Sequence, residues 1–127
     1  MFSHVMIGSN DIDRSKRFYD ALFTAIGGRE GRVDPKGRVM YLKDGGIFIL
    51  TKPIDGQPAT HGNGTTIGFA VSGPEQANAW HEAGIAAGGT PIEEDPGIRT
   101  GLGVALYLAY LRDPDGNKIC AMHRIPN

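Results

Sequence analysis

The side chains best suited to chemistry in this sequence are a single cysteine, Cys120, and four histidines. Thiolate and imidazole are both good zinc ligands, so a site that combined them could hold that ion. A cysteine can also act as a nucleophile, but it needs a base beside it, and nothing local to Cys120 supplies one. The plainest interpretation is a small buried residue, because free cysteines are among the most buried residue types.

Arg99 is a second chemical candidate, in a polar stretch that we expect to be a long loop from Glu93 to Gly103. Long loops of this kind often cover a binding site. A guanidinium can grip a carboxylate or phosphate with two hydrogen bonds, so Arg99 could bind an acidic group of a ligand. The alternative is an arginine that only faces solvent.

Two similar halves of the chain must position these residues. The stretch from His4 to Gly27 aligns without a gap with the stretch from Thr66 to Gly89, at a constant offset of 62 residues. The alignment brings Phe18 onto Trp80, among other pairs. Such a repeat restricts the architecture more than local propensity does, so we expect two copies of one unit.

Each half has the pattern of a strand, a helix and then two or three strands. In the first half we expect a strand over 5–8, a helix that Asn10 or Asp11 caps, and a hairpin of 38–42 with 46–51. The apolar residues of this helix recur at helical spacing and should form one stripe: Phe18, Tyr19, Leu22, Phe23 and Ile26. In the second half we expect a strand over 67–71, a helix with Pro74 in its first turn, and a hairpin of 104–112 with 118–123. The buried side of this helix should carry Ala77, Trp80, Ala83 and Ala87. The connector between the halves spans about residues 53–63.

The last hairpin is the clearest local prediction. Its turn, from Asp113 to Gly116, places proline where φ is fixed and glycine where φ must be positive. A three-residue loop there pairs Tyr110 with Cys120, and Leu108 with Met122, across the two strands. Side chains alternate along a strand, so these four share one face of the sheet.

The composition is that of one ordinary globular domain of 127 residues, with 40% hydrophobic and 21% charged residues. The 13 basic and 14 acidic residues nearly balance, so the charge gives no sign of binding to nucleic acid or to an anionic membrane. No stretch is long and apolar enough to cross a bilayer. A single cysteine cannot form an intrachain disulfide, so we expect a cytoplasmic protein.

Four motifs resemble those of the vicinal oxygen chelate superfamily, which includes glyoxalase I, bleomycin and fosfomycin resistance proteins, and extradiol dioxygenases. They are the His4-Val5 start of the first strand, the segment from Asn10 to Tyr19, the Gly62-Asn63-Gly64 connector, and the segment from Asp113 to Ile119. The resemblance covers essentially the whole chain.

The resemblance implies an α+β fold of two duplicated βαβββ modules, which form an open, cup-shaped mixed sheet with the helices outside. It implies a single domain over residues 1–127, with module one at about 1–55 and module two at about 64–127. Such a fold is usually completed by dimerisation, so we expect a homodimer.

Enzymes of this superfamily hold a divalent metal in the cup through His or Glu on the first and last strands of each module, and the metal acts as a Lewis acid. By resemblance, His4 and Cys120 stand at two of these four positions, as candidate ligands for Zn, Ni or Mn. The other two positions fall at Ile49 or Leu50, which cannot bind a metal, and at Thr66. Two protein ligands make a weak site, and no catalytic residue is assigned.

The resemblance also implies which side chains line the cup. The last-strand ligand of the superfamily points into it, so the face that carries Cys120 should do the same, and alternation along the first strand adds Met6 beside His4. His61, on the connector, could lean over the mouth of the cup. The predicted binding residues are Met6, His61, Arg99, Leu108, Tyr110 and Met122.

We therefore expect a protein that binds a small, largely apolar molecule in a cup whose metal site is eroded. The alternative is a metal-dependent lyase similar to lactoylglutathione lyase, or a related enzyme that acts on vicinal oxygens. A third interpretation is a resistance protein that sequesters a drug. Whether the chain is an enzyme stays open at this level, and its expected partners are a small molecule and a second copy of itself.

Overall fold

The computed structural model describes residues 1–101 and 103–126. Its first half has the order β1 (Val5–Gly8), α1 (Ile12–Ala25), β2 (Arg32–Val33), β3 (Val39–Lys43) and β4 (Gly46–Thr51). Its second half has the order β5 (Ile67–Ala70), α2 (Pro74–Ala86), β6 (Thr90–Pro91), β7 (Gly97–Gly101), β8 (Val104–Arg112) and β9 (Lys118–Ile125). The predicted offset of 62 residues relates β1 to β5 and the start of α1 to that of α2, which confirms the repeat.

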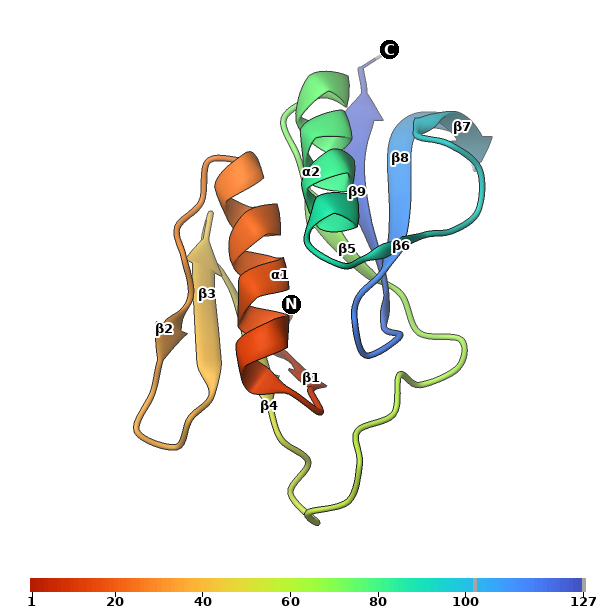
Figure 1. The fold of residues 1–127 in the computed structure, drawn as a ribbon. Coiled ribbons are helices and arrows are strands. Elements are labelled where there is room, and N and C mark those ends of the chain that lie inside the picture. Colours follow the sequence, from red (N-terminus) through yellow and green to blue (C-terminus); the bar gives the residue numbers. More distant parts are fainter. Residues whose placement is uncertain (102, 127) are drawn as a thin grey trace.

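The strands form two open mixed sheets, one from each half. The first has the order β1-β4-β3-β2 and the second the order β5-β9-β8-β6, with β7 also paired to β8. In each half the first strand lies parallel to the last one. The helices α1 and α2 lie side by side on the same side of the strands (Figure 1). Over the described residues, neither helix has the length and apolar character needed to cross a membrane.

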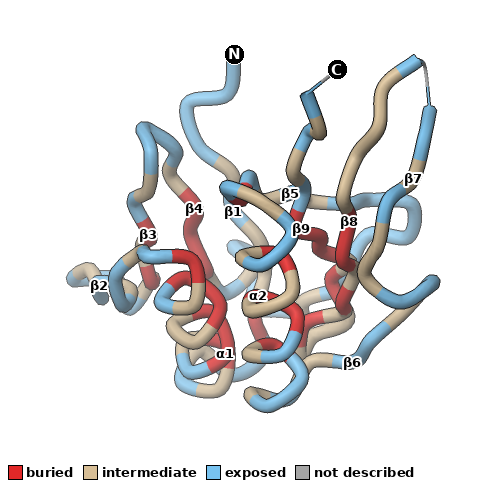
Figure 2. Tube along the Cα trace, turned by 90° about the horizontal axis from the view of Figure 1, so that it is seen from above, coloured by how far each residue is buried: buried red, intermediate tan, exposed pale blue. Residues whose placement is uncertain are grey.

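The core lies between the helices and the sheets, where Figure 2 shows the buried residues gathered. Asp11 caps the start of helix α1, since its side chain accepts a hydrogen bond from the Arg14 backbone N–H. Its predicted apolar stripe is confirmed as buried: Phe18, Tyr19, Leu22, Phe23 and Ile26. The helix ends before Gly27, which has a positive φ of 83°.

Helix α2 packs closely against α1 and β8. Pro74 stands at its start and Trp80 is buried, as predicted, whereas Ala83 and Ala87 are only partly covered. Gly84 is buried and leaves no room for a side chain. A Cβ atom there would overlap Cδ1 of Leu111 on β8 and lie 3.0 Å from Cδ2 of Leu22 on α1. The glycine therefore lets α2 approach both neighbours.

We expect Gly84→Ala to lower the free energy of unfolding by up to about 2 kcal/mol. Alanine gains about 1 kcal/mol of helix propensity, but overpacking a buried site costs roughly 1–3 kcal/mol. Urea denaturation followed by circular dichroism measures the difference. In a Leu111→Val background, which shortens the opposing side chain, the same change should cost less. A Gly84→Ala protein more stable than the wild type would contradict the close approach.

The two predicted hairpins are confirmed. The β3–β4 turn has positive φ at Asp44 and Gly45, at 50° and 81°. In the β8–β9 hairpin the backbone N–H of Asp113 donates to the Asn117 carbonyl. Tyr110 faces Cys120 across the strands, and Leu108 faces Met122.

The prediction of a long loop from Glu93 to Gly103 is wrong in its second part. Residues 97–101 form β7, which pairs antiparallel with the first half of β8. Glycines at both ends of the segment and Pro96 before it are typical of a loop. The segment nevertheless forms a strand, because the first half of β8 offers unpaired backbone groups, whereas β6 pairs with its last two residues. Arg99 is thus on a strand and not on a mobile loop.

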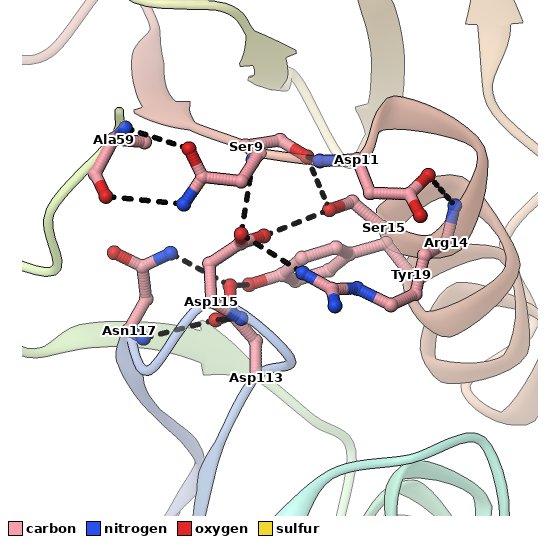
Figure 3. A network of polar contacts seen from close by, with 10 residues as sticks. Ser9, Asp11, Arg14, Ser15, Tyr19, Ala59, Asp113, Asp115 and Asn117 are labelled. Atoms are coloured by element: carbon pink, nitrogen blue, oxygen red, sulfur yellow. Dashed lines mark hydrogen bonds and ion pairs between the residues drawn. The ribbon is translucent and has the colours of Figure 1, made fainter. Parts of the chain in front are cut away.

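A buried polar network joins the two halves (Figure 3). The Asp115 carboxylate, on the β8–β9 turn, accepts hydrogen bonds from the Asn10 backbone N–H, the Arg14 guanidinium and the Ser15 hydroxyl, at 2.9–3.1 Å. Next to it, the Tyr19 hydroxyl donates to the Asp113 carboxylate at 2.6 Å. The turn of the second half is therefore fastened to the start of α1.

Candidate functional site

The face of the second sheet that points away from α2 carries most of the predicted binding residues. Alternate residues of β8 and β9 lie in the core under the helices: Ala109, Leu111, Ile119 and Ala121, all fully buried. The residues between them must point the other way: Leu108, Tyr110, Cys120, Met122 and, by the same alternation, Lys118. We call this set the helix-free face.

The helix-free face is apolar at its centre and charged at one edge. Leu108 and Cys120 are buried, whereas Met122 is 40% exposed. Beside them the Tyr110 ring has two cationic neighbours. The Arg99 guanidinium, from β7, lies 4.9 Å from the ring centre, and the Lys118 ammonium, from β9, lies 5.0 Å from it. Both distances are typical of cation–π contacts.

The two cations share one carboxylate, that of Glu93. Its Oε2 lies 2.5 Å from Lys118 Nζ, and its Oε1 lies 3.8 Å from Arg99 Nη1. Sequence reasoning missed both Glu93 and Lys118. Lys118 could have been found, because it stands two residues before Cys120 on the same strand. Glu93 stands between β6 and β7, and no periodic pattern indicates where its side chain points.

The Cys120 thiol is buried against Gly68 of β5, where an added Cβ atom would lie 3.3 Å from the sulfur. The pKa of this thiol is raised to about 11, mainly by burial; Lys118 and Arg99 act to lower it, and Glu93 acts to raise it. At neutral pH the sulfur is therefore a protonated, weakly polar part of the face. In this state it is a poor nucleophile and a poor metal ligand.

Met6 and His61 lie at a different place, where the two halves meet. Together with Lys118 they line a pocket of about 260 Å³ between β1, the connector and β9. The His61 ring lies against Gly116 of the β8–β9 turn, so close that a Cβ atom there would come within 3.3 Å of Nδ1. Lys118 is thus the residue that the pocket and the helix-free face have in common.

A wider groove of about 1330 Å³ runs along the connector and the start of α1. Met6 is on its wall, with Lys36, Arg38 and Lys52 among the charged residues. Asn10 fixes the connector here, since its side-chain amide exchanges two hydrogen bonds with the backbone of Ala59. The groove lies beside the first sheet and does not include the helix-free face.

A sequence profile of the Glyoxalase/Bleomycin resistance protein/Dioxygenase superfamily matches residues 1–121. The chain belongs to this superfamily. A crystal structure of a glyoxalase/bleomycin resistance protein from Albidiferax ferrireducens T118 is 60% identical to it, with a TM-score of 0.93, and the match covers 98% of this chain and 99% of that one. Comparison with curated proteins gave no match.

More distant superfamily structures share the fold alone. A glyoxalase/bleomycin resistance protein/dioxygenase family enzyme from Burkholderia phytofirmans PsJN is 22% identical over 97% of this chain and 98% of that one, with a TM-score of 0.74. A genomically encoded fosfomycin resistance protein from Listeria monocytogenes is 14% identical over 100% of this chain and 93% of that one, with a TM-score of 0.68. The family match over residues 1–121 and the structure that is 60% identical confirm the resemblance found in the sequence.

The metal site that the superfamily implies does not fit the residues present. Among the described residues, no three His, Cys, Asp or Glu side chains form a group that could hold a metal ion. His4 is exposed, and its Nδ1 is hydrogen bonded to the Ser3 hydroxyl at 2.8 Å. Cys120 is buried with a raised pKa, and Ile49 is a buried aliphatic residue on β4. We therefore derive no reaction step through a metal.

Proposed function

We propose that this superfamily member binds a small, largely apolar molecule on the helix-free face, and that the side chains of a single chain hold no metal there. The observation that carries the proposal is the makeup of that face. At the position where the superfamily implies a metal ligand stands a protonated thiol, with Leu108, Tyr110 and Met122 around it. Ligand pockets are mostly apolar, with a few polar groups that fix orientation.

The exposed methionine of the helix-free face supports this proposal. Met122 is 40% exposed, although most apolar side chains of β9 are covered. Methionine is flexible and polarisable, so it suits a surface that adapts to a ligand. A metal-dependent lyase is the weaker candidate, since a Lewis acid would need ligands that His4 and Cys120 do not supply. Homodimerisation and a cytoplasmic location stay predictions.

Binding of a neutral fluorescent probe, N-phenyl-1-naphthylamine, tests the proposal. We expect saturable binding to the wild type and at least about tenfold weaker binding to Tyr110→Ala, because removing an aromatic contact costs about 1.5–3 kcal/mol. Probe emission measures binding, and circular dichroism checks that the variant stays folded.

Ile98→Ala is the matched control. Ile98 is an exposed apolar residue on β7, next to Arg99, so its side chain points to the opposite side of the strand. This variant should bind the probe as the wild type does. Equal binding by Tyr110→Ala and the wild type would refute the assigned face. Near-stoichiometric Zn, Ni or Mn in the purified protein, lost in His4→Ala, would instead favour the lyase.

A further inference from the structure

The arrangement of charge around Tyr110 indicates what kind of ligand the helix-free face receives. Strands β7 and β9 flank β8 and each brings one cation to the same ring, Arg99 and Lys118. Both side chains are mostly covered, with 23% and 29% of their surface exposed. Two partly buried cations so close together need an anion with them.

Glu93 supplies that anion, with one oxygen toward each cation. The neighbouring Glu94 contributes less. Its Oε2 lies 4.0 Å from Arg99 Nε and its side chain is 89% exposed, although its backbone carbonyl accepts a hydrogen bond from Arg99 at 3.2 Å. The inner carboxylate, which lies between the cations, is therefore that of Glu93.

Glu93 is held less firmly than the cations it bridges. Arg99 and Lys118 are on paired strands, whereas Glu93 belongs to the short connection between β6 and β7. Its φ is 58°, in the left-handed region that residues other than glycine rarely adopt, and its side chain is 40% exposed. A change of this connection could withdraw the carboxylate without moving either strand.

We propose that the ligand is an organic acid with an aromatic or branched apolar body, whose carboxylate replaces that of Glu93 between Arg99 and Lys118. This inference rests on the proposed function and adds the substrate class to it. One carboxylate takes the place of another, so the cations keep a partner throughout the exchange. The apolar body then lies over Tyr110, Leu108 and Met122, and Glu93 acts as an internal competitor.

A matched pair of probes, 2-naphthoate and 2-naphthalenemethanol, tests this inference by isothermal titration calorimetry at pH 7. The two share a ring system, but only the first carries a charge. We expect the acid to bind at least about tenfold more tightly, since hydrogen bonds to a charged group are the stronger ones. The preference for the acid should fall as salt is added.

Variants of the two glutamates separate competition from a general effect of charge. Glu93→Gln removes the internal carboxylate, so the acid should bind roughly two- to fivefold more tightly while the alcohol is unaffected. Glu94→Gln removes an equal charge one residue away and should leave both affinities nearly unchanged. Lys118→Met should abolish the preference for the acid.

The outcomes distinguish this inference from the proposed function. If neither probe binds, the binding function itself fails, and the inference with it. If both probes bind equally well and Glu93→Gln changes neither, the binding function stands, but Glu93, Arg99 and Lys118 form an internal ion-pair cluster only. If the acid is preferred and Glu93→Gln strengthens its binding, the inference holds. The wild-type comparison needs no variant, so it also stands if Glu93→Gln folds poorly.

Discussion

Replacement of Asp113 by alanine is expected to lower the free energy of unfolding by about 3–5 kcal/mol. The Asp113 carboxylate is buried and accepts four hydrogen bonds, from the Tyr19 hydroxyl, the Asn117 side chain, and the backbone N–H groups of Asp115 and Asn117, at 2.6–2.9 Å. Alanine would leave these donors without a partner, and each buried orphan costs roughly 1–3 kcal/mol. Costs at neighbouring groups of one network do not add, so the total is smaller than four separate costs.

Urea denaturation of a small set of variants measures this effect. Tyr19→Phe removes one of the four donors and nothing else, so it should cost only about 1–2 kcal/mol. Asp113→Asn keeps an acceptor for the two backbone donors, so its cost should lie between those of Tyr19→Phe and Asp113→Ala. In the double variant with Tyr19→Phe, Asp113→Ala should cost less than it does alone, because the buried hydroxyl is gone. A cost below 1 kcal/mol for Asp113→Ala would show that the network does not hold the halves together.

This network explains why the most recognisable motif of the chain indicates the fold and not the activity. The turn from Asp113 to Asn117 fastens the last hairpin to the start of α1. Buried hydrogen bonds, and not contacts on the helix-free face, account for the residues of this turn. Relatives with this motif can share an architecture and still differ in chemistry, since function depends on the site and not on the fold.

The parts of the fold that depend on local signals could be predicted from the sequence. The cap at Asp11, the apolar stripe of α1 and the turns of the two hairpins each depend on residues a few positions apart. The register of β8 with β9 follows from the length of its turn, and it correctly placed Tyr110 opposite Cys120. Membership of the superfamily followed from the same motifs.

The positions of Arg99 and Glu93 at the charged edge of the site could not be predicted, because they depend on how distant segments meet. The strand β7 forms on the edge of β8, although its own sequence is typical of a loop. This pairing brings Arg99 over the Tyr110 ring, a contact that the sequence alone does not indicate. Glu93 reaches the same place only through its left-handed backbone, which no pattern of residue types indicates. The pairing of His4 with Cys120 as metal ligands stays a prediction, and in the structure the first residue is exposed and the second is buried.

The Cys120 thiol is expected to react with iodoacetamide about 100-fold more slowly in the folded protein than in the unfolded chain at pH 8. Burial raises its pKa from 9.0 to about 11, so the thiolate, which is the reactive form, becomes about 100-fold scarcer. Because the folded pKa is the higher one, the difference is largest below pH 9 and shrinks as the pH rises toward 11. Restricted access to the buried sulfur slows the folded protein further.

Mass spectrometry of the alkylated protein, with and without urea, measures both rates from pH 7 to 10.5. The rate of the unfolded chain should reach half of its plateau near pH 9, the ordinary pKa of a thiol, and level off above it, while the rate of the folded protein keeps rising. Two single substitutions should change the rate in opposite directions. Lys118→Met removes a cation that lowers the Cys120 pKa, so it should slow the reaction. Glu93→Gln removes an anion that raises this pKa, so it should speed the reaction. A folded-state rate that levels off below pH 8 would mean a thiolate at neutral pH. The sulfur could then bind a metal or attack a substrate, and the case for a face that only binds an apolar acid would fall.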